Sequence, residues 1–203
     1  MIRRRATVAA VCCVLLVAGA CGDDGDGAAA GSDDGAQRRS TSGGEHVGPA
    51  SEGVDGVHAY RVDSNEHTEE PLAYGLVPPV GGEHFPVPAT CGFYETDPPP
   101  DEMLVHDLEH GAIWVAYDPA LDDTQLTALR ELVAQQAKVT ATPHDGLDTS
   151  LVVSAWGRQL PLDSVDDPRL QQFVETYRNS SNAPEPEAAC QGVGEPAVPS
   201  PAA

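Results

Sequence analysis

Apolar side chains in the second half of the chain follow the period of amphipathic helices over two stretches. Residues 122–138 carry a helical stripe of Leu126, Leu129, Leu132, Val133 and Ala137, and residues 168–177 carry apolar residues at i, i+3, i+4 and i+7, counted from Leu170. Asp122 and Gln125 form a capping-box pattern at the start of the first stretch. Pro168 suits the first turn of the second, because its missing N–H needs no partner there. The pattern therefore predicts two amphipathic helices.

Uninterrupted apolar runs indicate the strands that these helices would cover. Residues 112–117 and 151–156 read as buried strands, and residues 139–142 as a shorter one. Residues 57–100 are instead punctuated by Gly and Pro, so regular structure there must be short, and such loops commonly position functional side chains. The order of elements predicts an α+β fold. We expect a small mixed β-sheet covered by two amphipathic helices, with a long Pro/Gly-rich N-terminal half.

A third, shorter helix is expected over residues 103–110, directly before the first buried strand. His106 and His110 are four residues apart, which places both imidazoles on one helix face. Gly111 follows as a natural helix terminator, because glycine tolerates the left-handed conformation found there. The sequence thus predicts a histidine pair at a firmly held junction of helix and strand.

The N-terminal residues have the pattern of an export signal. Residues 1–20 combine a basic start with a short apolar run that ends in small residues. The run closes on Ala18-Gly19-Ala20-Cys21, which resembles a bacterial lipobox and predicts lipidation of Cys21, although Ala18 stands where Leu is usual. Simple signal cleavage is the alternative. The expected location is the outer face of the cytoplasmic membrane, reached through a lipid anchor.

Composition divides the rest of the chain into three parts. Residues 21–56 are rich in Gly, Asp, Ser and Ala, and we interpret them as a disordered acidic tether in which His46 is solvated. Residues 57–178 are predicted to form a single globular domain. Residues 179–203 form a Pro/Ala-rich tail.

Two of the five cysteines remain for a disulfide once the signal and Cys21 are set aside. Cys91 and Cys190 would then pair in an oxidising compartment. The alternative is two free thiols, with Cys91 as a soft metal ligand near the histidines.

The net charge of the chain excludes one class of partner. After loss of the signal, 8 basic residues would face 32 acidic ones. A net charge of −24 repels phosphate backbones, so we expect no nucleic-acid partner.

Four histidines are the candidate ligands of one transition-metal ion, zinc or copper. Imidazole is the commonest transition-metal ligand where cysteines are oxidised, and four imidazoles suit a tetrahedral ion. The set is His67, His84, His106 and His110. Glu83, Asp107 and Glu109 are the acidic neighbours that could orient the imidazole rings. Met103 would add a soft thioether to a cuprous site, whereas His144 reads as a surface residue.

Two other interpretations of the same residues stay open. His106-Asp-Leu-Glu109-His110 matches H-x-x-E-H, in which two histidines bind zinc and Glu109 activates water as the catalytic base of a hydrolase. That signature needs a longer helix and a distant acidic ligand, and neither is visible. Alternatively, the histidines form a structural hydrogen-bonded network in a non-catalytic envelope interaction module. The sequence favours a binding protein over an enzyme.

Several spaced motifs resemble the bacterial domain-of-unknown-function 3105 family (DUF3105). They are His67, Tyr74, residues 77–84, residues 91–94, the Val-His-Asp-Leu-Glu-His-Gly block at residues 105–111, and residues 155–158. The resemblance covers about residues 58–186. It implies an exported or membrane-anchored bacterial protein, implies no settled activity, and includes His67, His84, His106, Glu109 and His110 among the shared motifs. Val80 departs from the Thr or Ser of the family.

Overall fold

The structure is a computed structural model that describes residues 39–201 apart from residues 42 and 52. All described residues belong to the second of two contact units, Ala36–Ala203. The predicted signal, Cys21 and the first part of the predicted tether lie outside the described residues. Within them, no helix is both long and apolar enough to cross a bilayer.

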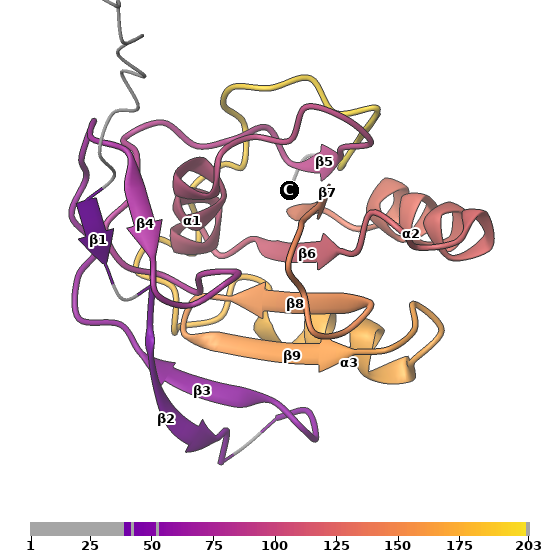
Figure 1. Ribbon diagram of the computed structural model, residues 1–203, viewed down its shortest axis with the longest axis horizontal. Helices are drawn as coiled ribbons and strands as arrows, with labels where there is room; N and C mark the ends of the chain where they lie inside the picture. The colour runs from indigo at the N-terminus through magenta and orange to yellow at the C-terminus, as the bar shows by residue number, and fades with distance from the viewer. Residues whose placement is uncertain (1–38, 42, 52, 202–203) are drawn as a thin grey trace, which may run out of the picture. The chain divides into compact units, whose positions relative to one another are not determined.

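An eight-stranded mixed sheet and three helices make up most of the described chain (Figure 1). The sheet order is β10-β5-β7-β6-β8-β9-β3-β2, and β1 pairs separately with β4. The helices are α1 (Asp101–Glu109), α2 (Asp123–Gln135) and α3 (Pro168–Tyr177). The strands are β1 (Arg39–Thr41), β2 (Glu45–Pro49), β3 (His58–Arg61), β4 (Leu72–Tyr74), β5 (Gly92–Phe93), β6 (Ile113–Tyr117), β7 (Val139–Pro143), β8 (Leu151–Ala155), β9 (Arg158–Leu162) and β10 (Val198–Pro199).

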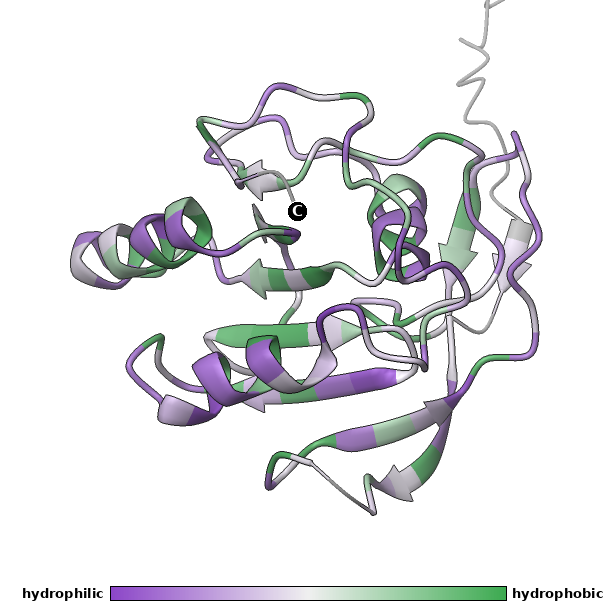
Figure 2. Cartoon of the chain, turned by 180° about the vertical axis from the view of Figure 1, so that it is seen from behind, coloured by the Kyte–Doolittle hydropathy of each residue, from purple (hydrophilic) through white to green (hydrophobic). Residues whose placement is uncertain are grey.

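The central strand β6 is buried on both faces, which explains its uninterrupted apolar sequence. Ile113 and Val115 belong to the apolar cluster that holds the inner residues of α2 and α3. Trp114 and Ala116, which point the opposite way, pack with the apolar residues of α1. Helices therefore cover both faces of the sheet. Figure 2 shows β6 and β8 as largely hydrophobic strands, while the surface of α3 turned toward the viewer is mostly hydrophilic.

The predicted fold class is confirmed, because the chain combines three helices with a mixed sheet. Both amphipathic helices lie where their periods place them, and Asp122 caps α2 by accepting from the backbone N–H groups of Thr124 and Gln125. Asp167 caps α3 in a similar way, by accepting from the backbone N–H of Arg169.

The sheet is larger than the small one expected, because it also takes strands from both ends of the described chain. The first strand of the described residues starts at Arg39, inside residues 21–56 that the sequence predicts as a tether. Strand β2 pairs antiparallel with β3, so the ring of His46 lies against that of His58, Nε2 to Nδ1 3.1 Å. In the predicted tail, β10 pairs with β5. Backbone pairing with an existing sheet orders these polar segments, and composition alone does not reveal it.

His144 gives the fold a pH-dependent contact at the start of α1. Its Nε2 lies 3.5 Å from Oδ2 of Asp101, and this hydrogen bond raises the pKa of His144 above its ordinary value. Because this pKa is higher in the folded state than in the unfolded state, protonated His144 stabilises the fold. The stabilisation is complete at pH values below the unfolded-state pKa of about 6.5, and it is lost as the pH rises through the folded-state pKa.

We therefore expect His144→Gln to lower the free energy of unfolding by about 0.5–1 kcal/mol more at pH 5.5 than at pH 8.5, after allowance for solvent screening. Urea unfolding at the two pH values measures this difference. Asp101→Asn is the control, since in that background the pH-dependent part should vanish. An equal loss at both pH values would show that His144 contributes only packing.

Candidate metal centre

Helix α1 holds two of the candidate side chains on a rigid base. Leu104, Val105 and Leu108 pack into the apolar cluster under β6, while His106 and Glu109, three residues apart, occupy another side of the helix. The helix ends at Glu109 with His110 as its C-cap, and Gly111 takes the expected left-handed conformation at φ +78°.

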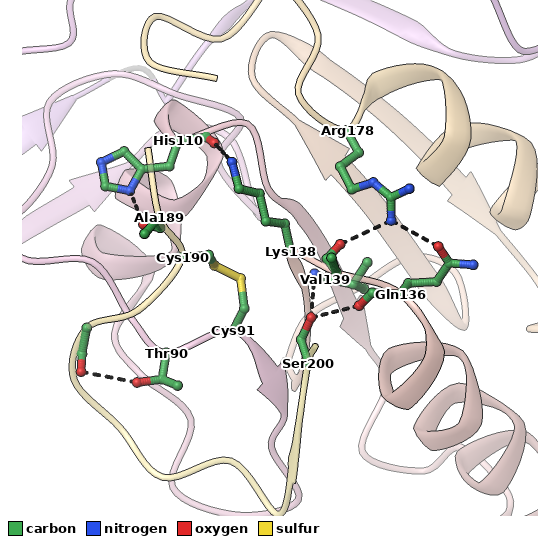
Figure 3. The surroundings of a disulfide bond; sticks show 12 residues. Thr90, Cys91, His110, Gln136, Lys138, Val139, Arg178, Ala189, Cys190 and Ser200 are labelled. Atoms are coloured by element: carbon green, nitrogen blue, oxygen red, sulfur yellow. Dashed lines mark hydrogen bonds between the residues drawn. A yellow bond between two sulfur atoms is a disulfide. The ribbon is translucent and has the colours of Figure 1, made fainter. Parts of the chain in front are cut away.

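A buried lysine fixes the end of α1 to two other parts of the chain. Lys138 Nζ donates to the carbonyl oxygens of His110 at 3.0 Å and Pro186 at 2.8 Å, and to Oδ1 of Asn179 at 2.9 Å. Figure 3 shows the ammonium group directed at the His110 carbonyl. A cation at this position also matches the negative end of the helix dipole. The residues at the end of α1 are thus held in place.

Two extended segments bring further histidines over α1. His67 and His84 lie opposite each other in an isolated parallel bridge. Thr68 N donates to His84 O at 2.8 Å, and His84 N donates to Glu66 O at 3.2 Å. The bridge is joined to the helix because Phe85 N donates to Glu102 O at 3.4 Å. Backbone bonds therefore set the positions of both rings.

Four side chains from these three segments meet in one group: His67, His84, His106 and Glu109. One ligand atom from each lies within 4.8 Å of the others. Glu109 Oε2 is 3.0 Å from His84 Nε2 and 3.5 Å from His67 Nε2. His67 stacks on His106 with ring centroids 5.0 Å apart. Three of the four side chains are buried, whereas the His67 side chain is 47% exposed.

Backbone carbonyls determine which ring nitrogens face the group. Nδ1 of His84 lies 2.8 Å from Gly82 O, and Nδ1 of His106 lies 2.6 Å from Phe85 O. Because a carbonyl oxygen can only accept, we assign the ring proton to Nδ1 in both. In the neutral rings Nε2 then presents a lone pair, which is the form that binds a metal. His84 Nε2 and the Glu109 carboxylate thus face each other as two acceptors that need a shared proton or cation.

The electrostatics of the group favour a charged Glu109 and a neutral His106. Burial alone would raise the pKa of Glu109, but the hydrogen bond from Asn65 Nδ2 at 2.8 Å and the neighbouring His84 and His106 lower it on balance. Burial lowers the pKa of His106. An ionised carboxylate beside unprotonated imidazoles is the protonation state that metal coordination requires.

The other predicted residues occupy different places. Nε2 of His110 lies 3.0 Å from Nε2 of His106, beside the group of four. Asp107 points elsewhere, toward Cys91 and Cys190, and burial raises the pKa of its carboxyl group well above the usual range. Glu83 is outside the group, and its backbone carbonyl accepts from Tyr74 Oη. Met103 is partly buried and packs against the apolar cluster that contains Leu104, Val105 and Leu108.

The predicted disulfide between Cys91 and Cys190 is confirmed, and it fastens the C-terminal segment beside α1 (Figure 3). That segment supplies Ala189 O, which lies 2.8 Å from Nδ1 of His110. It also supplies Glu185, whose backbone N–H donates to Glu109 O. Neither Glu185 nor Asn65 can be identified from the sequence, since a lone polar residue in a loop carries no spacing signal.

Fold and site together define the class of protein: an α+β domain with a histidine–carboxylate group over a buried helix. The chain belongs to the family described as Protein of unknown function (DUF3105), whose model matches residues 66–192. The match confirms the resemblance seen in the motifs, and the matched range holds all four members of the group. No curated protein and no solved structure matches the chain.

Proposed function

We propose that this protein binds one transition-metal ion, zinc or copper, through His67, His84, His106 and Glu109. The observation that carries the proposal is the convergence of three imidazoles and one carboxylate from three segments within 4.8 Å. A tetrahedral ion with bonds of about 2.0 Å separates its ligand atoms by about 3.3 Å. The 3.0 and 3.5 Å separations around Glu109 Oε2 bracket that value.

The donor atoms favour divalent over cuprous ions. Nitrogen and carboxylate oxygen suit Zn²⁺ and Cu²⁺, whereas Cu⁺ prefers thiolate or thioether sulfur. Met103 is packed in the apolar cluster, and Cys91 and Cys190 are bonded to each other. The high negative charge of the chain, −21 in all, would attract cations toward the surface.

The proposed setting is the cell envelope, with the protein attached to the outer face of the cytoplasmic membrane through lipidated Cys21. The basic and apolar start of the chain and the lipobox-like residues support export. A disulfide also suits an oxidising compartment. The proposed partners are the membrane and the metal ion, and the acidic composition argues against nucleic acid.

A zinc-dependent hydrolase is the second candidate, because one side of the group is open to solvent. The exposed side of His67 would let water reach an ion, and catalytic zinc sites keep such an open position. Glu109 would then act as the base of the H-x-x-E-H pattern. Its position among the ligand atoms, 3.0 Å from His84 Nε2, fits a ligand better than a base.

Titration of the metal-free protein with Zn²⁺ or Cu²⁺ tests the proposal. We expect uptake of one equivalent, and at 100 times Kd a gain of about 2.7 kcal/mol in the free energy of unfolding. His67→Ala should weaken binding by at least about tenfold and leave the metal-free protein equally stable, because the His67 side chain is half exposed.

His46→Ala is the matched control, since His46 is an exposed histidine outside the group. It should bind the ion as the wild type does. Calorimetric titration and thermal unfolding, each with and without the ion, give both quantities. The proposal fails if the wild-type protein takes up no ion, or if the two variants bind it equally well.

A further inference from the structure

His110 continues the line of ligand atoms from the buried group toward the solvent. Its Nε2 lies 3.0 Å from Nε2 of His106 and 3.8 Å from Oε2 of Glu185. Its Nδ1 faces the carbonyl of Ala189, so we assign the ring proton to Nδ1 and a lone pair to Nε2. Neither His106 Nε2 nor Glu185 Oε2 can donate to that lone pair when the rings are neutral. The arrangement calls for a shared proton or a cation.

Exposure changes stepwise along this line. The His110 side chain is 11% exposed, whereas that of Glu185 is 61% exposed. A hydrated cation would therefore meet the Glu185 carboxylate first, then His110, and then His106. Carboxylate and imidazole are both ligands of divalent zinc and copper.

The segment that carries Glu185 is held close to α1 rather than loosely attached. Glu185 N donates to Glu109 O at 3.0 Å, and Pro186 O accepts from Lys138 Nζ at 2.8 Å. Ala189 O accepts a hydrogen bond from His110 Nδ1, and a disulfide joins Cys190 to Cys91 (Figure 3). These contacts fix the backbone on both sides of Glu185, so its carboxylate stays within reach of His110.

We propose that His110 and Glu185 form a second, outer coordination position next to His106, through which the ion enters and leaves. This inference rests on the proposed function. The inner set offers four protein ligands and the outer set two, one of them largely exposed, so the ion rests in the inner position.

Transfer between the positions needs only ligand exchange at an ion of unchanged charge. Water molecules of the hydrated ion are replaced by Glu185 and His110, and these in turn by the inner ligands, beginning with His106. No electron is transferred, and no covalent bond of the protein is formed or broken. A residue on such a path changes the rates of binding and release equally and leaves the equilibrium unchanged, because both directions cross the same barrier.

Stopped-flow mixing of the full chain with Zn²⁺, and of the loaded protein with a chromophoric chelator, measures the two rates. We expect Glu185→Gln to slow both by about five- to tenfold with Kd unchanged within about twofold. Glu187→Gln is the matched control, because Glu187 is also exposed and lies two residues after Glu185, so the substitution removes the same charge. It should leave both rates close to those of the wild type.

His110→Asn is the second variant, since its amide can still donate to Ala189 O while Nε2 is removed. It should also slow both rates and keep the one-to-one stoichiometry. A weaker Kd with faster release would instead make His110 a ligand of the resting ion and overturn the outer position. Wild-type rates in Glu185→Gln would overturn it too, because the ion then passes His67. A wild-type protein that takes up no ion overturns the proposed function as well.

Discussion

Glu109→Gln is expected to weaken Zn²⁺ binding by about 100-fold or more, which is a loss of about 2.7 kcal/mol. The substitution removes the only charged ligand of the proposed inner set and keeps its shape. The amide oxygen can still accept from Asn65 Nδ2, and the amide N–H can donate to His84 Nε2 where the carboxylate faced it as a second acceptor. The metal-free variant should therefore be at least as stable as the wild type. Competition titration against a chelator measures the affinity, and urea unfolding measures the stability.

The same variant separates the two candidate functions. If Glu109 is the base of a hydrolase, Glu109→Gln keeps the ion and loses turnover, so unchanged Zn²⁺ affinity in this variant would contradict the ligand role. Glu83→Gln is the control: Glu83 precedes His84 in the sequence, but its carboxylate is not in the group of four. It should bind Zn²⁺ with the affinity of the wild type.

Removal of the disulfide is expected to give the largest change in stability. Cys91 and Cys190 are 99 residues apart, so their bond closes a long loop and restricts the unfolded chain strongly. The chain-entropy model gives about 4–5 kcal/mol for a loop of this size, and measured losses usually fall within about 2–5 kcal/mol. The double variant Cys91→Ala/Cys190→Ala should lose stability by that amount.

Guanidinium unfolding with and without a thiol-free reductant measures this loss. The reductant should shift the midpoint of the wild-type protein toward that of the double variant and leave the variant itself unchanged. A wild-type midpoint that does not respond to reduction, in a protein shown to be reduced, would contradict the expectation. It would mean that hydrogen bonds such as those of Lys138 hold the C-terminal segment without the covalent link.

Periodic sequence predicts part of this fold well, because the signal is local. α2 and α3 could be predicted from their apolar stripes and caps, and β6 and β8 from their unbroken apolar runs. Strands β5 and β10 have only two residues each, so they carry no period. They exist because a neighbouring strand offers backbone donors and acceptors, and that is a property of the folded chain.

The candidate site shows the same division between local and distant information. Residue type and the four-residue spacing indicate His106 and His110, whereas only the chemistry of imidazole indicates the loop histidines. The spacing could not show that Glu109 joins His67, His84 and His106, because that depends on the bridge between two distant segments. Asn65 and Glu185 come close only through the backbone path of their loops.

The burial of α1 has a consequence for how an ion would be chosen. Seven of its nine residues are buried, and the sheet, the histidine bridge and the C-terminal segment restrain it from several directions. Such a helix leaves little freedom for the polypeptide to rearrange when a cation arrives. Binding should then be accompanied by a small heat-capacity change, in contrast to small domains that fold around their zinc. Discrimination between cations of similar charge would come from fixed spacing and ligand chemistry, which are already present in the polypeptide alone.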